Sequence, residues 1–131
     1  MFDHLSIAVR SIAQAEPFYD AVMAALGHPK VGSNSGWIGY GLRADLEHPR
    51  RVYLSILQDP DTAASPARHW AFAVPDRGAV DAFWQAGLKA GGTDDGPPGV
   101  RPEYHETYYA AFLIDPDGNR IEAVCHMAAA V

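Results

Sequence analysis

The sequence predicts an α+β fold built from two βαβββ modules, and an internal repeat is the first observation that predicts it. The apolar run 4–9 begins with His4, and the apolar run 69–74 begins with His69. A helix-like segment follows each run and ends at a glycine, at the same distance from the histidine in both copies. Two copies are typical of a duplicated module rather than of a long array of repeats.

The first half of the chain, residues 1–62, has the pattern of a strand, a helix and three further strands. Residues 2–9 are predicted to form the first strand. Ser11 is a residue type that caps helices, and the apolar residues after it recur with a helical period as far as Leu26. Glycines and prolines separate the remaining strands, which are expected around Val31, over 37–40 and over 52–57.

The second half, residues 66–131, repeats this order. Its last two strands are joined by the sequence Asp-Pro-Asp-Gly-Asn at 115–119, in which proline fixes φ and glycine supplies a positive φ, as a tight turn requires. The predicted elements are a strand over 68–74, a helix capped by Asp76 and running to Ala90, a glycine- and proline-rich stretch over 91–102, and strands over 108–114 and 120–126.

The alternation of side chains along the strands predicts a cup-shaped cavity. Successive residues of a strand point to opposite faces of the sheet. His4, His69 and Glu122 fall on the faces opposite to the large apolar residues, which should pack against the helices. A curled mixed sheet around a cavity, with the helices outside, fits this pattern better than a sheet covered on both faces. Small residues accompany the polar ones, namely Ser6, Ala8, Ala71 and Ala73.

Length and composition limit the classes of function. The chain has 131 residues, of which 48% are hydrophobic and 20% are charged, as in a single globular domain spanning 1–131. The net charge of −6 argues against a nucleic-acid surface and against an acidic membrane as partner. Cys125 is the only cysteine, and neither a signal peptide nor a membrane-length apolar run is visible, so we expect a cytoplasmic location.

Two histidines and a carboxylate on one concave surface predict a divalent-metal site. Imidazole suits Fe(II), Mn, Ni, Co and Zn, and a carboxylate neutralises part of the charge; the sequence does not choose among these metals. Three protein ligands leave positions for water and substrate, as in catalytic sites. We therefore predict that His4, His69 and Glu122 hold a metal that polarises substrate oxygens. The alternative is a satisfied buried polar set, or the relic of a site in a binding protein.

Four segments of the chain together resemble a known family. The last of them, in which Asp-Pro-Asp-Gly-Asn is followed by Arg-Ile-Glu, is the most specific, and the four span 3–9, 18–27, 69–74 and 115–122. The chain resembles the vicinal oxygen chelate superfamily, which holds glyoxalase I, type I extradiol dioxygenases, fosfomycin-resistance thiol transferases and bleomycin-resistance proteins. The resemblance covers essentially the whole chain. It implies paired βαβββ modules that form a cup, with metal ligands on the first and last strand of each module.

The three predicted ligands match three of the four positions that this resemblance implies. The fourth falls on the strand 52–57, which has no acidic residue, so that water, Tyr53 or Ser55 would take the place. The resulting set is similar to the facial triad of the extradiol dioxygenases and to the metal set of the fosfomycin transferases. The loop 91–107, however, lacks the lysine with which the transferases hold a phosphonate, and this weakens the transferase interpretation.

His105 and Tyr108 are the predicted catalytic side chains. The polar segment 101–109 that contains them precedes a strand and could overhang the cup. Histidine titrates near neutral pH, which suits His105 to acid–base catalysis. The resemblance implies that Tyr108 faces the cavity, where its hydroxyl could orient a bound oxygen. His126 lies four residues after Glu122 on the same face and is expected at the rim.

These observations predict a metal-dependent enzyme that acts on a small oxygenated organic substrate. The three-ligand set favours dioxygenase-type chemistry, with lyase or isomerase chemistry next. A homodimer is expected because similar proteins often form one, and the sequence leaves open whether the modules close one cup within a chain or pair across the dimer. The alternative function is a metal-free small-molecule or drug-binding protein of the bleomycin-resistance type, with which a net charge of −6 is compatible.

Overall fold

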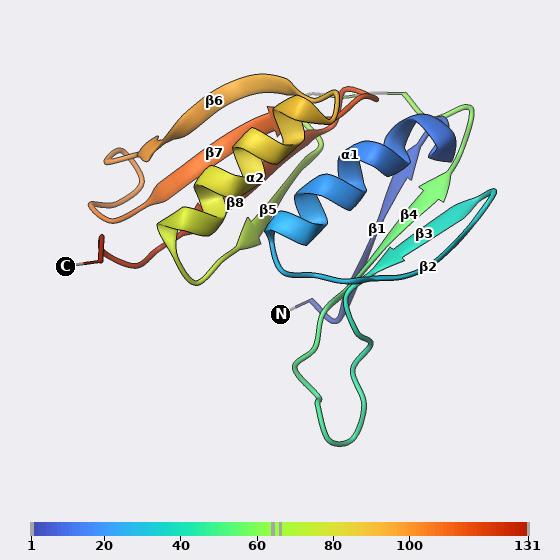
Figure 1. Ribbon diagram of the computed structural model, residues 1–131, viewed down its shortest axis with the longest axis horizontal. Helices are drawn as coiled ribbons and strands as arrows, with labels where there is room; N and C mark the ends of the chain where they lie inside the picture. The colour runs from blue at the N-terminus through green and yellow to red at the C-terminus, as the bar shows by residue number, and fades with distance from the viewer. Residues whose placement is uncertain (1, 64, 66, 131) are drawn as a thin grey trace.

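The computed structural model describes residues 2–63, 65 and 67–130, and it shows two helices with two mixed β-sheets (Figure 1). Pro66, the predicted first residue of the second module, lies outside the described residues. Both halves have the predicted order of elements. These are β1 (His4–Val9), α1 (Ile12–Ala25), β2 (Lys30–Asn34), β3 (Trp37–Tyr40), β4 (Tyr53–Gln58), β5 (His69–Ala73), α2 (Arg77–Lys89), β6 (Thr93–Val100), β7 (Tyr109–Ile114) and β8 (Arg120–Cys125).

Each half of the chain forms its own four-stranded sheet, and the two sheets have equivalent strand orders. The first is β1-β4-β3-β2 and the second is β5-β8-β7-β6. β1 is parallel to β4 and β5 is parallel to β8, whereas the other neighbouring strands are antiparallel. The predicted α+β fold of paired βαβββ modules is confirmed. The strands that begin with the two repeated histidines, β1 and β5, each form one edge of their sheet.

Both helices begin at the predicted caps and lie side by side against the sheets (Figure 1). The Ser11 hydroxyl accepts a hydrogen bond from the backbone N–H of Gln14, and the Asp76 carboxylate accepts one from Ala79. The large apolar residues of β1 and β5 face the helices, as the alternation predicts, so that both modules share one hydrophobic core. Fully buried members of this core include Ile7, Phe18, Phe83 and Ile121.

The turn between β7 and β8 fastens the second module to the first. The Tyr19 hydroxyl on α1 donates to Asp115 Oδ2 over 2.5 Å, and the Asn119 amide donates to the same oxygen over 2.9 Å. At the end of β1, the backbone N–H and Nε of Arg10 lie 2.6 and 2.9 Å from the two carboxylate oxygens of Asp117. The Asp-Pro-Asp-Gly-Asn sequence thus makes contacts between modules in addition to forming a turn.

β6 forms in the stretch whose glycine and proline content is typical of a loop. It pairs with β7 and has register shifts between Asp94 and Gly96 and between Gly96 and Gly99. Proline has no N–H to give to a ladder, and edge strands tolerate it because one side of the strand has no partner. The position of β6 at the edge of the second sheet therefore explains a strand that holds two consecutive prolines, Pro97 and Pro98.

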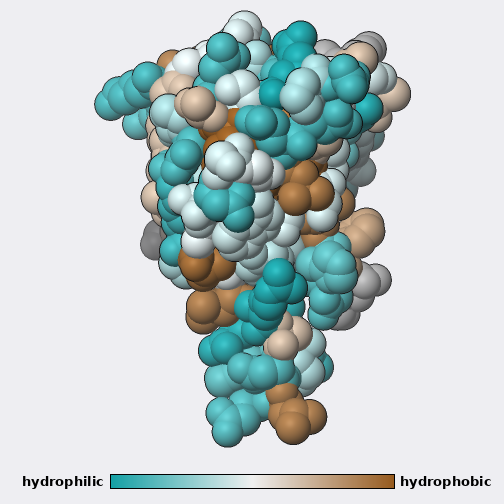
Figure 2. Space-filling model, turned by 90° about the vertical axis from the view of Figure 1, so that its right-hand side faces the viewer, coloured by the Kyte–Doolittle hydropathy of each residue, from teal (hydrophilic) through white to brown (hydrophobic). Residues whose placement is uncertain are grey.

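The loop over 41–52, between β3 and β4, projects away from the first sheet (Figure 1). Figure 2 shows this lower end of the molecule as a mostly hydrophilic surface with a hydrophobic patch at its tip. Asp45 orders the loop by accepting hydrogen bonds from the His48 backbone and from Arg51, while Leu46 is fully exposed. Across the described parts of the chain, no helix is long and apolar enough to cross a bilayer.

Candidate metal and substrate site

His69 and Glu122 meet on the face of the second sheet that points away from the helices. His69 begins β5 and Glu122 lies in the middle of β8, and these strands are parallel neighbours. His69 Nε2 is 2.7 Å from Glu122 Oε2. The Glu122 side chain is only 2% exposed, whereas the His69 side chain is 35% exposed. A buried carboxylate therefore lies beside an imidazole that solvent can reach, and two of the three predicted metal ligands are in contact.

Tyr108 holds the other oxygen of Glu122. Its hydroxyl donates to Glu122 Oε1 over 2.5 Å. Burial, together with the hydrogen bond to Glu122 and its charge, raises the pKa of Tyr108 above its ordinary value, so the phenol remains a donor at neutral pH. A buried carboxylate is costly unless it is hydrogen-bonded, and both oxygens of Glu122 have a partner. Tyr108 thus positions the carboxylate that is predicted to bind the metal.

His4 lies apart from this pair within a single chain. Its side chain is 64% exposed, and its Nδ1 lies 2.7 Å from the neighbouring Asp3 carboxylate. Among the residues that the structure describes, no three His, Cys, Asp or Glu side chains are placed to hold one metal ion. One chain therefore brings together His69 and Glu122 but not His4, and the three-ligand site remains a prediction.

Ser55 occupies the position in the first module that corresponds to Glu122 in the second. The register pairs His4 with Tyr53 in one sheet and His69 with Arg120 in the other, so the residue two places further along β4 matches Glu122. The Ser55 hydroxyl accepts a hydrogen bond from the Trp37 indole over 3.2 Å. This position therefore carries a hydroxyl with a protein partner, whereas its counterpart in the second module carries a carboxylate.

His105 forms a pair with His126 beside Tyr108. His105 Nε2 is 2.9 Å from His126 Nδ1, and the Thr107 backbone N–H donates to His105 Nδ1 over 3.2 Å. Because Nδ1 accepts, a neutral His105 carries its proton on Nε2 and donates it toward His126. The Tyr108 ring contacts both imidazoles edge-on. His126, which was expected only at the rim, is thus part of one polar cluster with the predicted catalytic residues His105 and Tyr108. Its position on the same strand face as Glu122 is the feature of the sequence that indicates this.

Phe112 and Arg120 complete the same open face, although the sequence alone did not single out Arg120. Phe112 pairs directly with Glu122 in the register, and its ring centroid lies 6.0 Å from that of His69. Arg120 is two residues before Glu122 on β8, and its guanidinium carbon lies 4.7 Å from the Phe112 ring centre. The period of two along the strand could have identified Arg120 as a neighbour of the site.

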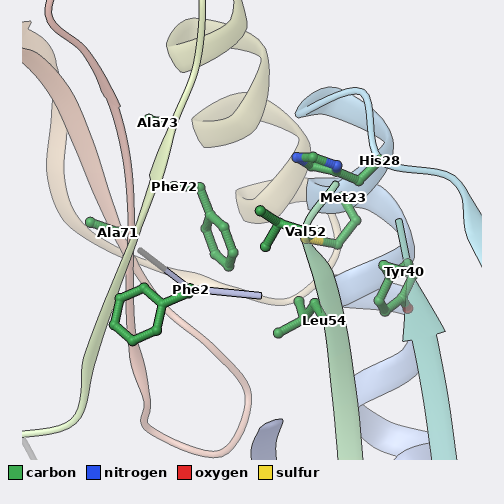
Figure 3. Close-up of a pocket in the computed structure, with 9 residues that line it drawn as sticks. All are labelled: Phe2, Met23, His28, Tyr40, Val52, Leu54, Ala71, Phe72 and Ala73. Atoms are coloured by element: carbon green, nitrogen blue, oxygen red, sulfur yellow. The ribbon is translucent and has the colours of Figure 1, made fainter. Parts of the chain in front are cut away.

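A separate apolar cavity of about 350 Å³ lies between the two modules. Figure 3 shows Phe2 and Phe72 projecting into it from one side and Leu54, Met23 and Tyr40 from the other. His28 also borders it, and burial lowers the pKa of that imidazole, which favours the neutral form. The remaining lining residues are Val52, Ala71 and Ala73. The cavity therefore offers a largely apolar surface, unlike the polar cluster around Glu122.

Comparisons with known proteins agree with this architecture. The family model described as the Glyoxalase/Bleomycin resistance protein/Dioxygenase superfamily matches residues 1–123. The chain belongs to this superfamily. A glyoxalase/bleomycin resistance protein from Albidiferax ferrireducens is similar in structure, with a TM-score of 0.78 and 30% sequence identity over 95% of this chain and 98% of that one. A comparison with curated protein sequences finds no match.

More distant solved structures of the superfamily share the fold. A glyoxalase/bleomycin resistance protein/dioxygenase family enzyme from Burkholderia phytofirmans has a TM-score of 0.69 at 19% identity, over 95% of this chain and 98% of that chain. Lactoylglutathione lyase from Agrobacterium tumefaciens has a TM-score of 0.65 at 16% identity, over 95% and 92%. At these identities the likeness concerns the fold, and the activity has to be argued from the site.

Proposed function

We propose that this glyoxalase-superfamily protein is a metal-dependent enzyme acting on a small oxygenated organic substrate. The observation that carries the proposal is the contact between His69 and the buried Glu122, with the Tyr108 hydroxyl on the other carboxylate oxygen. Metal-binding carboxylates are commonly oriented by such a hydrogen bond from outside the coordination sphere. Imidazole and carboxylate are also the donors that divalent transition metals accept. His69 and Glu122 therefore fit the role of two ligands.

The third ligand in this proposal is His4 of a second copy of the chain. His4 is exposed on β1, which is an edge strand of the first sheet, and His69 is on β5, an edge strand of the second. Within one chain the modules contact each other through α1 and α2 and through the β7–β8 turn that holds Asp115, and the side chains of His4 and His69 are 64% and 35% exposed. A two-fold homodimer that places β1 of each chain beside β5 of the other would complete two equivalent sites.

The residues around the site have distinct roles in the proposed reaction. A divalent metal held there would polarise the substrate oxygens that bind to it. Tyr108 fixes the orientation of Glu122, because its hydroxyl donates a hydrogen bond to that carboxylate. His105 is the acid–base candidate: its Nδ1 is occupied by Thr107, so protons move through Nε2 and His126. Dioxygenase-type chemistry fits a three-ligand set best, with lyase or isomerase chemistry next.

Metal analysis of the purified protein tests this proposal. We expect one divalent metal per chain in the wild type and its loss in Glu122→Gln, His69→Ala and His4→Ala. His48→Ala is the matched control, because His48 also pairs with a carboxylate, that of Asp45, but in the projecting loop. Stoichiometric metal that persists in all three site variants would contradict the proposal. Oxygen uptake over a panel of catechol-type substrates with Fe(II) then separates dioxygenase from lyase chemistry.

The apolar cavity supports a second candidate function, which is metal-free binding of an aromatic molecule. Phe2, Phe72 and the neutral His28 would supply stacking surfaces and one hydrogen-bonding group. Under this alternative, a naphthalene-type fluorescent probe binds equally well to the wild type and to the His4→Ala, His69→Ala double variant. Phe72→Ala would abolish that binding. Binding that requires the metal-site histidines would exclude this alternative.

A further inference from the structure

Two arginine side chains flank Phe112 on the open face beside His69 and Glu122. The guanidinium carbon of Arg120 lies 4.7 Å from the Phe112 ring centre, and that of Arg101 lies 5.5 Å from it. Guanidinium groups are attracted to aromatic faces, so the ring holds both cations in place. Phe112 itself is the register partner of Glu122. The positive charges are thus anchored next to the predicted metal ligands.

The backbone of β6 is shaped to accommodate Arg101. A side chain at Gly96 would place its Cβ 3.3 Å from Arg101 Nη2, and one at Gly99 would place its Cβ 3.0 Å from Nη1. Both glycines therefore leave the space in which the guanidinium lies. Nη2 donates to the backbone oxygen of Pro97 over 2.7 Å, which fixes the orientation of the group. The hydrogen bond to Pro97 and the space beside the two glycines together support this position of the guanidinium.

Only one of these two arginines is paired with a carboxylate of a described residue. Arg120 Nε is paired with Asp95 Oδ2 at 2.7 Å, and Glu122 is engaged by His69 and Tyr108. Arg101 takes part in no ion pair with any residue that the structure describes. Arg101 therefore presents guanidinium N–H groups beside the predicted active site that no described carboxylate engages. Arginine is suited to binding carboxylates because its N–H groups match both oxygens.

We propose that Arg101, assisted by Arg120, binds a carboxylate of the substrate, so that the substrate is an oxygenated organic acid. Its metal-binding oxygens would face His69 and Glu122, and its carboxylate would lie at the arginines beside Phe112. This inference rests on the proposed metal site and adds the chemical class of its substrate. Arg101 is the specificity-determining residue, because Asp95 already engages the guanidinium of Arg120.

Calorimetric binding of two matched probes to Fe(II)-loaded protein without oxygen tests the proposal. The probes are 3,4-dihydroxybenzoate and 3,4-dihydroxybenzamide, which share the chelating oxygens and the shape but differ in the charge of one group. We expect the acid to bind roughly tenfold to hundredfold more tightly than the amide, as a charge-assisted bidentate contact provides. Arg101→Gln should bring this preference to within about twofold, mainly through a loss of affinity for the acid, and Arg101→Lys should keep part of it.

The outcomes separate this inference from the proposed function. Arg50→Gln, in the projecting loop, is the control and should keep the full preference for the acid. Equal binding of both probes by the wild type would overturn the carboxylate assignment while the metal site stands. A preference that survives in Arg101→Gln would also overturn it. If neither probe binds to the metal-loaded wild type, the proposed site itself is wrong, and the inference falls with it.

Discussion

Replacement of Tyr108 by phenylalanine tests the support of the buried carboxylate. The change removes one hydroxyl, which donates to Glu122 Oε1 over 2.5 Å, and keeps the ring that contacts His105 and His126. The Glu122 side chain, 2% exposed, would then keep only the His69 imidazole at 2.7 Å. A buried acceptor that loses its donor destabilises the folded state, since water in the unfolded chain replaces the partner.

The expected loss of unfolding free energy in Tyr108→Phe follows from the burial of Tyr108 and Glu122. A hydrogen bond to a charged group contributes about 1.5–3 kcal/mol to stability. Tyr108 is only half-buried and His69 still engages the other oxygen, so we expect the lower part of the range, about 1.5–2 kcal/mol. Urea unfolding of metal-free protein measures this loss. Titration with a divalent metal measures the second effect, a decrease in affinity of roughly tenfold to hundredfold, as for other groups that orient a ligand.

Tyr104→Phe is the matched control for this experiment. The Tyr104 ring centroid lies 4.7 Å from that of Tyr108, but its side chain is mostly exposed, and its hydroxyl forms no hydrogen bond within the described part of the chain. We expect its unfolding free energy and metal affinity to equal those of the wild type. If Tyr108→Phe matches Tyr104→Phe in both measurements, the assignment of Tyr108 as the group that positions Glu122 is refuted.

Three further predictions concern the core, the contact between modules and the histidine pair. Gly87→Ala would place a Cβ 2.2 Å from a Leu113 methyl, so thermal unfolding should show a loss of about 1–3 kcal/mol; an unchanged melting temperature would contradict this. Tyr19→Phe removes the donor to Asp115 and should cost about 1–3 kcal/mol at pH 7. Burial and Asp115 raise the pKa of Tyr19, so the stability that its hydroxyl contributes is complete below about pH 10 and is lost as the pH rises through the raised pKa. In urea unfolding from pH 7 to 11, the difference in unfolding free energy between wild type and variant should therefore shrink at the alkaline end. His105→Asn should lower kcat while metal content and KM stay within about twofold, because it removes the proton carrier and not a ligand; a loss of metal would refute that role.

Local patterns were sufficient to predict all of the fold except the strand β6. Ser11 and Asp76 begin the two helices as expected, because a side-chain oxygen before an apolar periodic segment satisfies free N–H groups whatever the rest of the chain does. The alternation in β1 and β5 likewise predicts which faces pack against helices. β6 is the exception, since its prolines are tolerated only at a sheet edge, and the position of a strand within a sheet is not a local property.

The candidate site was only partly predictable. The period of two along the strands predicts that His69 and Glu122 lie on the face opposite to the large apolar residues, and the parallel pairing of β5 with β8 brings them into contact. The separation of His4 from His69 and Glu122 could not be predicted, because it depends on how the packing of α1 against α2 joins the two modules. The Tyr19–Asp115 contact and the approach of Arg101 to Phe112 also depend on tertiary packing between residues far apart in the chain.

Metal content of mixed dimers tests the central claim most directly. His4→Ala and Glu122→Gln chains are prepared separately, each expected to be free of bound metal, and are then unfolded together and refolded. If His4 of one chain completes the site of the other, a mixed dimer has one site with both changes and one intact site, so it should bind one metal ion. If each site forms within one chain, both sites of the mixed dimer are defective. Mixed dimers that bind no metal would contradict the shared site.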